Sequence, residues 1–213
     1  KPERYNLRLA RPEALVPRHL CLGVRERMRA NGAIETPLDM ASLDAAIQVL
    51  KQQQVTSVAV CYLHAYRDGR HEQATREALA TALPDVHVCL SSEVLPQIKE
   101  YERVSTTVVN AYVAPILARY LSRLERALEA AGYGGPVLIM LSHGGIAPIG
   151  EAIRMAAGTV LSGPAGGVSG AAFLATLAGH EDALGFDMGG TSTDVSLIQN
   201  GRPLISRQTS LGY

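Results

Sequence analysis

Apolar and polar positions alternate between helical and strand patterns in the first half of the chain. Apolar residues at helical spacing predict a helix over residues 42–51, with Ser42 as its cap, and a β-branched run predicts a buried strand at 55–63. A second helix is expected at 72–83 and a second strand at 86–90. This order of helix, strand, helix and strand predicts an α/β layer with parallel strand pairing.

The longest periodic segment covers residues 100–131, where apolar residues recur at steps of three and four. It predicts one long helix, or two helices that meet near Pro115. Its first half is unusually polar, with Ser105, Thr106, Thr107 and Asn110. Such residues are typical of a capped helix start, or of a helix edge that faces a functional site.

Two glycine-rich stretches follow the long helix. A compact apolar strand at 136–141 leads into Ser142, His143, Gly144 and Gly145, and loops after the strands of open α/β sheets usually contact ligands. His143 could act as a general base, although a histidine in such a turn more often makes structural hydrogen bonds. Residues 162–167 then precede an alanine-rich helix through residue 178. Their glycines favour close packing against a sheet, and the helix N-terminus could also bind an anion.

Residues 183–198 combine a strand, a glycine turn and a second strand. The first apolar run ends at Asp187, Gly189 and Gly190 follow, and three hydroxyls precede the second run, on Thr191, Ser192 and Thr193. Successive backbone N–H groups in a glycine turn form a concave anion site, and the Asp187 carboxylate could hold Mg²⁺ beside a phosphate. An ordinary β-hairpin with a Gly-Gly turn fits the same pattern.

Commoner nucleotide and metal motifs do not fit these stretches. No lysine follows the glycines as a Walker-type loop requires, and the glycine spacing does not match the dinucleotide fingerprint. His64, His71 and His87 have no ligand-like partner at helical or turn spacing, so a metal site built from them is not expected.

Composition narrows the class of protein. The 213 residues are 47% hydrophobic and 19% charged. Because 20 Lys and Arg balance 20 Asp and Glu, the chain has no charge excess of the kind that indicates binding to nucleic acid or to a membrane surface. Cys21, Cys61 and Cys89 are scattered, which favours a reducing cytoplasm over a disulfide framework or a zinc site. The uncharged stretch 155–179 contains Pro164 and many small residues and is not expected to span a bilayer.

Four separated stretches carry a common pattern, namely residues 101–112, 142–145, 162–168 and 187–195. Together they resemble the hydantoinase A / 5-oxoprolinase family. Residues 58–64 and the region around Leu38 are also similar to the N-terminal region of that family. The order and spacing of the stretches agree, whereas each motif alone is weak. Leu141 departs from the pattern, in which a polar residue is expected before the serine.

The resemblance implies an α/β fold of the actin-like ATPase (ribonuclease H-like) type, with a mixed sheet flanked by helices. It also implies that the chain is a fragment of a larger two-lobed protein. Residues 1–95 would end the N-terminal region of the family, and residues 96–213 would start its ATPase region. Within the latter, residues 162–178 would form the connecting helix and residues 186–191 the second phosphate motif.

Members of this family use ATP to open cyclic amides such as hydantoins or 5-oxoproline, and relatives carboxylate ketones. The resemblance therefore implies phosphoryl transfer to the amide oxygen, with Asp187 and Thr191 as catalytic residues and Asp187 as the ligand of Mg²⁺ or another divalent cation. The implied nucleotide contacts are Gly189, Gly190, Thr191, Ser192 and Thr193, and the candidate substrate contacts are Ser142, His143, Gly144 and Gly145. Asp194 could instead stabilise the turn.

Two other functions stay open, namely ketone carboxylation and a non-catalytic module that binds nucleotide or a partner. A first phosphate motif and an adenosine motif are not found in the sequence, so we expect that the fragment does not turn over ATP by itself. The expected partners are a small cyclic amide or ketone and a second subunit or domain of the same enzyme. Nucleic acid and membrane are not expected as partners.

Overall fold

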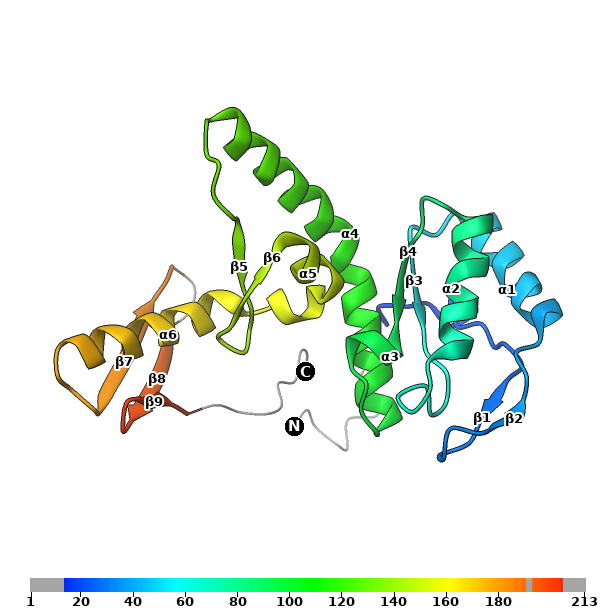
Figure 1. Ribbon diagram of the computed structural model, residues 1–213, viewed down its shortest axis with the longest axis horizontal. Coiled ribbons are helices and arrows are strands. Elements are labelled where there is room, and N and C mark those ends of the chain that lie inside the picture. The colour runs from blue at the N-terminus through cyan, green and yellow to red at the C-terminus, as the bar shows by residue number, and fades with distance from the viewer. Residues whose placement is uncertain (1–13, 191–192, 205–213) are drawn as a thin grey trace, which may run out of the picture. The chain divides into compact units, whose positions relative to one another are not determined.

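A computed structural model describes residues 14–190 and 193–204, and its elements are labelled in Figure 1. The helices are η1 (Arg18–Leu20), α1 (Met40–Gln52), α2 (Arg70–Ala82), α3 (Ser91–Val94), α4 (Glu100–Ala130), α5 (Ile149–Arg154), η2 (Ala156–Thr159) and α6 (Ser162–Leu177). The strands are β1 (Arg27–Met28), β2 (Ile34–Thr36), β3 (Ser57–Val60), β4 (His87–Leu90), β5 (Leu138–Met140), β6 (Ile146–Pro148), β7 (Ala183–Met188), β8 (Thr193–Gln199) and β9 (Arg202–Pro203). The predicted α/β class is confirmed.

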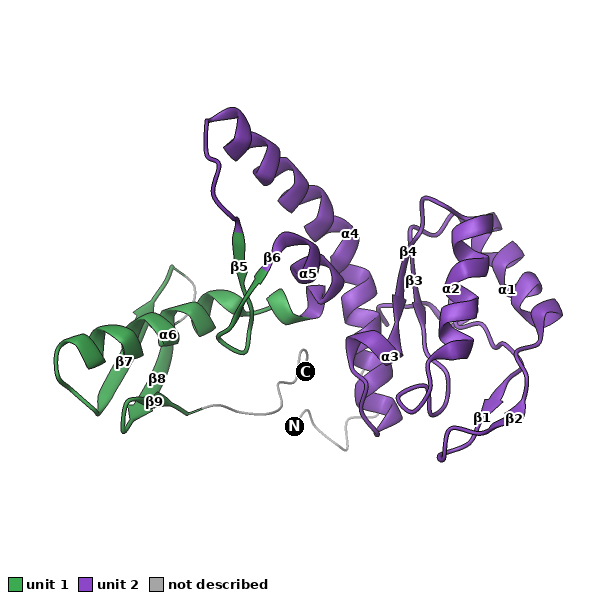
Figure 2. Ribbon diagram, viewed as in Figure 1, with its two compact units in different colours: residues 1–13, 138–147, 158–213 green, residues 14–137, 148–157 purple. Residues whose placement is uncertain are grey.

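The chain divides into two compact units, coloured separately in Figure 2. We call residues 14–137 and 148–157 the parallel-sheet unit. The described residues of the other unit, 138–147 and 158–204, form the hairpin unit. The division expected between residues 95 and 96 concerns regions of the family rather than compact units, and it stays a prediction.

The parallel-sheet unit is organised around β3 and β4. The two strands pair in parallel, with Ser57 opposite His87 and Val60 opposite Leu90, as the sequence predicts. One face packs on α1 and α2 through a buried cluster of Leu43, Ile47, Leu50, Val60, Leu79 and Leu90. On the other face Cys89 packs against Ala111 of α4. Helices on both faces explain why both strands are mainly apolar.

Helix α1 begins before its predicted cap. Asp39 is the N-cap, and its Oδ1 accepts a hydrogen bond of 3.0 Å from the N–H of Ala41. Ser42, the predicted cap, lies inside the helix, where its hydroxyl donates to the carbonyl of Asp39 and accepts from the N–H of Arg25. The prediction of Ser42 as the cap was wrong because both residue types suit this position, and only the backbone path selects one.

Helix α4 is one helix that continues through Pro115. Proline lacks an N–H, so the carbonyl of Ala111, four residues earlier, has no helical donor. The Ser57 hydroxyl of β3 donates to that carbonyl at 2.6 Å. A hydrogen bond from the neighbouring strand thus satisfies the acceptor that the proline leaves free, and the alternative of two helices is wrong.

The described residues form no single mixed sheet, contrary to expectation. They form three two-stranded sheets and one three-stranded sheet, and β3 pairs only with β4 within this part of the chain. An apolar groove of about 970 Å³ runs along the free edge of β3, and residues of α1 and α4 line its sides. Within the described residues, β3 and β4 each have one edge without a strand partner, and the groove lies at that of β3.

The hairpin unit consists of α6, the sheet of β7, β8 and β9, and the β5–β6 pair. Helix α6 starts at Ser162, so the glycines expected to precede the helix lie within it. Strands β7 and β8 are antiparallel, and β8 turns into β9 through Asn200 and Gly201, both at positive φ, as predicted. Among the described residues, no helix is long and apolar enough to cross a membrane.

Candidate functional site

The candidate phosphate site is the turn between β7 and β8. Asp187 is the next-to-last residue of β7 and pairs across the hairpin with Asp194, one residue into β8. Asp187, Gly189, Gly190, Thr193 and Asp194 are all exposed. Thr191 and Ser192, also predicted as site residues, lie outside the described residues. The predicted strand, turn and strand are therefore present.

Alternate residues of the hairpin face opposite sides. A Cβ placed on Gly167 of α6 would lie 3.5 Å from Asp187 Oδ2, and one on Gly185 would lie 3.6 Å from the Ala171 Cβ. These contacts place α6 on the same side as Asp187. The other side is apolar and exposed, with Leu184, Phe186, Met188, Val195 and Leu197.

The two opposed carboxylates suit a cation. Like charges directly across a strand pair repel each other, and within the described residues neither Asp187 nor Asp194 makes an ion pair or a side-chain hydrogen bond. No group of three or more metal-ligating side chains occurs in this part of the chain. Protein Mg²⁺ sites often use one or two carboxylates together with phosphate oxygens and water. The residues present therefore fit Mg²⁺ held jointly with a phosphate.

The space beside Gly190 is open. A Cβ placed on Gly190 would have no heavy atom within 4 Å. Backbone N–H groups at such an open turn can approach an anion closely. This geometry does not by itself separate a phosphate loop from an ordinary hairpin, which shares its strand pairing.

The turn at 142–145 is closed by its own hydrogen bonds. The N–H of Gly145 donates to His143 Nδ1 at 3.2 Å, and the N–H of Leu141 donates to the carbonyl of Gly145 at 2.8 Å. Gly144 has a φ of +85°, and Leu141, which departs from the family pattern, is buried. His143 thus makes the structural hydrogen bond typical of a turn histidine, while its exposed ring leaves Nε2 available.

Helix α6 contacts both candidate groups on different faces. A Cβ on Gly144 would lie 3.1 Å from Ser169 Oγ, and one on Gly166 would lie 3.4 Å from the Met140 Cγ. Residues 166 and 169 share one helix face, whereas residues 167 and 171, near β7, share another that is rotated by roughly 150°. The turn at 142–145 and Asp187 therefore lie on different sides of α6.

Three polar residues of α4, Arg103, Thr107 and Asn110, face the interior of the parallel-sheet unit. Arg103 is 1% exposed and Thr107 and Asn110 are fully buried. Asn110 Nδ2 donates to the carbonyl of Arg154 at 3.1 Å, and its Oδ1 accepts from the N–H of Ala157 at 2.9 Å. Thr107 and Asn110 lie beyond the first turn of α4 and therefore do not cap its start. Their spacing of four and three residues places them on one buried face.

A buried ionic network joins the ends of β3 and β4. Arg103 donates to the Tyr62 carbonyl at 2.8 Å and to Ser91 Oγ at 3.2 Å. Glu72 accepts from Ser91 Oγ at 2.6 Å and from the N–H of Tyr62 at 2.9 Å. Sequence reasoning missed this network because its members are far apart in the chain. Each charged group has several partners, so the network is structural.

The thiol of Cys61 lies beside this network. Burial, and secondly the negative charge of Glu72, raise the pKa of Cys61 from its ordinary value of 9.0 to about 12. The protonated thiol is a poor nucleophile. Among the histidines, His71 Nδ1 lies 2.9 Å from Glu26 Oε2, and burial lowers the pKa of His87. These groups indicate no reactive centre.

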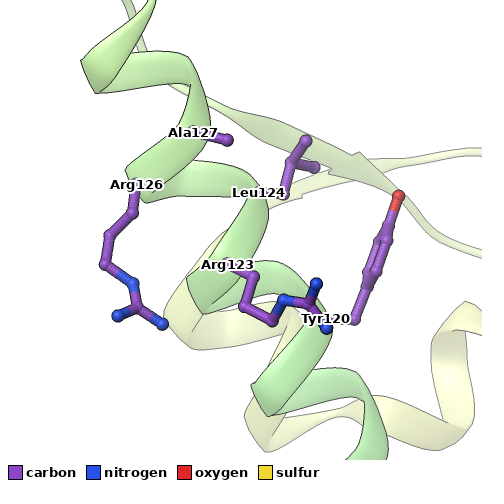
Figure 3. A pocket seen from close by; sticks show the side chains of 5 residues that line it. All are labelled: Tyr120, Arg123, Leu124, Arg126 and Ala127. Carbon is purple, nitrogen blue, oxygen red and sulfur yellow. The ribbon is translucent and has the colours of Figure 1, made fainter.

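A shallow hollow of about 600 Å³ lies on the second half of α4 (Figure 3). Its lining comes from this one helix, namely Tyr120, Arg123, Leu124, Arg126 and Ala127. The Arg126 side chain extends away from the side on which Tyr120 stands. The lining contains no carboxylate, histidine or cysteine.

Comparison with known proteins identifies the family. A profile described as Hydantoinase/oxoprolinase matches residues 103–213, and one described as Hydantoinase/oxoprolinase N-terminal region matches residues 1–83. An uncharacterized protein of Methanocaldococcus jannaschii is 36% identical over 100% of this chain and 31% of its own length. The caprolactamase subunit alpha of Pseudomonas jessenii is 38% identical over 97% of this chain and 30% of its own length.

Two solved structures are similar to this chain. Nucleotide-free acetone carboxylase has a TM-score of 0.79 and 32% identity, covering 90% of this chain and 27% of its own. The ATP-dependent caprolactamase from Pseudomonas jessenii has a TM-score of 0.77 and 37% identity, covering 91% of this chain and 28% of its own length. This chain thus spans about three-tenths of the length of these relatives. It belongs to the hydantoinase/oxoprolinase family.

Proposed function

We propose that the chain is part of the ATP-binding subunit of an ATP-dependent enzyme that hydrolyses cyclic amides. Relatives support this proposal. One is named a caprolactamase subunit, and the 5-oxoprolinases of Saccharomyces cerevisiae and Arabidopsis thaliana are 36% and 39% identical to this chain. The observation that carries the proposal is the hairpin turn, where an exposed Asp187 precedes two glycines. Such an arrangement can bind a phosphate and its metal together.

The proposed roles follow from the chemistry of phosphoryl transfer. Asp187 would hold Mg²⁺, which when bound would neutralise charge on the phosphates. The backbone of Gly189 and Gly190, with Thr191, Ser192 and Thr193, would bind the phosphate oxygens, and Thr191 would act in catalysis. Because phosphoryl transfer depends mainly on positioning and charge neutralisation, no covalent nucleophile is required. The protonated Cys61 thiol is consistent with this.

The same proposal includes an actin-like, two-lobed parent enzyme with a partner subunit. The open edge of β3 and the bare apolar face of the hairpin support further covering elements. Relatives named as subunits of caprolactamase and of acetone and acetophenone carboxylases support a partner. Ser142, His143, Gly144 and Gly145 remain the proposed substrate contacts, and the cytoplasm remains the proposed location.

The test replaces Asp187 in the full-length protein. Asp187→Asn should lower ATP hydrolysis by about 100-fold or more, because the metal loses its anionic ligand. It should leave the melting temperature nearly unchanged, because the side chain is exposed. Glu181→Gln, an exposed carboxylate of the same unit, is the control. Full ATP turnover by Asp187→Asn would contradict the proposal.

Ketone carboxylation is the second candidate, favoured by the likeness to acetone carboxylase at a TM-score of 0.79. The substrate that stimulates ATP consumption distinguishes the two reactions. For an amidohydrolase, a lactam alone should stimulate ATP consumption, whereas a carboxylase should require a ketone together with bicarbonate. A protein that binds Mg-ATP but consumes none with either substrate would be a non-catalytic binding module.

A further inference from the structure

We propose that Gly167 is a positioning residue for Asp187, so that α6 determines where the hairpin holds its carboxylate. Both residues belong to the hairpin unit. The inference rests on the proposed role of Asp187 in binding Mg-ATP. With it, Gly167, which lies outside the turn, joins the residues that determine how tightly the site binds the metal.

The glycines of α6 differ in their surroundings. Glycine is unfavourable in a helix interior, yet α6 contains Gly163, Gly166, Gly167 and Gly170. A Cβ on Gly163 or Gly170 would meet no heavy atom within 4 Å. A Cβ on Gly167 would lie 3.5 Å from Asp187 Oδ2. Packing therefore gives a reason for a small residue at position 167, and none at positions 163 and 170.

The neighbour of Gly167 is a charged oxygen that has few other constraints. Asp187 makes no ion pair or side-chain hydrogen bond within the described residues. A methyl group at 3.5 Å from its Oδ2 is in ordinary contact and fits. The extra methyl groups of a β-branched side chain would crowd the carboxylate, forcing a rotamer change or covering the oxygen that a metal needs.

A second glycine marks the close approach of α6 to β7. The position of a Cβ on Gly185 lies 3.6 Å from the Ala171 Cβ, one helical turn beyond Gly167. Gly185 and Asp187 are two residues apart in β7 and share one face. The helix thus lies beside the strand as far as the carboxylate.

The experiment measures how Mg²⁺ supports ATP binding by the full-length protein, using calorimetry at increasing Mg²⁺. Gly167→Val should raise the half-saturating Mg²⁺ concentration by roughly 10- to 100-fold, because small displacements in a site carry such costs. Gly167→Ala should stay within about twofold of the unsubstituted protein, because a methyl group makes only ordinary contact. Gly170→Val is the matched control, since it has the same helix propensity cost and no neighbour at its Cβ.

A merely structural role predicts a different result, in which both valine variants lower the melting temperature alike and leave Mg²⁺ dependence unchanged. That result would overturn the proposal. A double substitution sharpens the test: once Asp187 is replaced by Asn, Gly167→Val should weaken Mg-ATP binding little further, whereas additive losses would contradict action through Asp187.

The outcomes also separate this proposal from the proposed function. Full ATP turnover by Asp187→Asn would remove the function and the positioning role together. Loss of turnover in Asp187→Asn, combined with unchanged Mg²⁺ dependence in Gly167→Val, would remove the positioning role alone.

Discussion

The two units differ in the burial and hydrogen bonding of their polar side chains. In the parallel-sheet unit, Arg103, Glu72 and Asn110 are buried, and each has several hydrogen-bond partners. In the hairpin unit, Asp187 and Asp194 are exposed and make no side-chain hydrogen bond within the described residues. Buried, fully paired groups stabilise a fold, whereas exposed, unpaired groups at a strand end remain available to a ligand.

The contrast extends to the apolar residues. Both hydrophobic core clusters of the described residues lie in the parallel-sheet unit. The hairpin instead exposes Phe186 by 61% and Met188 by 70%. Stability is therefore concentrated in one unit and candidate chemistry in the other. We expect substitutions in the first to change folding, and substitutions in the second to change ligand binding.

The largest effect on stability is expected from Arg103→Met. The change removes the donors to Ser91 and Tyr62 and should lower the free energy of unfolding by about 3–5 kcal/mol. Urea denaturation measures it, with the exposed Arg126→Met as the control. ATP turnover per folded molecule should not change. A stable Arg103→Met protein without turnover would break the contrast, because Arg103 would then serve the reaction.

A smaller effect is expected from Ser57→Ala. It leaves the carbonyl of Ala111 without its donor and should cost about 1–2 kcal/mol, the penalty of an unsatisfied buried acceptor. The background Pro115→Ala provides the control, because it restores a backbone N–H that can donate to Ala111. In the Pro115→Ala background, Ser57→Ala should therefore lower the free energy of unfolding by a smaller amount, as measured by urea denaturation. Equal costs in both backgrounds would show that the Ser57 hydroxyl does not compensate for the proline.

The smallest effect at neutral pH concerns Cys61. Its folded pKa of about 12 exceeds its ordinary value of 9.0, so between these values the folded protein keeps a proton that the unfolded chain has lost. Its contribution to stability is therefore complete below pH 9 and is lost as pH rises toward 12. Denaturation midpoints should fall less steeply over this range in Cys61→Ala. The exposed Cys21→Ala should match the unsubstituted protein, and a steep fall retained in Cys61→Ala would contradict the assignment.

Much of the local structure could be predicted from sequence. The periodicity of residues 100–131 closely predicts α4, and the apolar run at 55–63 contains β3. The glycine pair after Asp187 predicts the turn between β7 and β8. These signals work because a helix period, a strand run or a glycine turn is set by residues that are close in the chain.

Helix starts and the roles of polar residues were harder to predict. Asp39 and Ser42 are equally suitable caps, and the glycines at the start of α6 suit a loop as well as a helix. Thr107 and Asn110 suggested a cap or a functional edge, because sequence alone does not show what faces them. Their burial depends on β4, Arg154 and Ala157, which come from distant parts of the chain.

The sequence by itself determined the long helix α4, the parallel pair of β3 and β4, and the glycine turn that carries Asp187. Only the tertiary structure decided which polar groups are structural and which are free. It paired Arg103 with Tyr62, 41 residues away, and it placed Gly167 against Asp187, 20 residues later. The physical reason is that burial and hydrogen bonding depend on neighbours in space, and packing of distant segments chooses those neighbours.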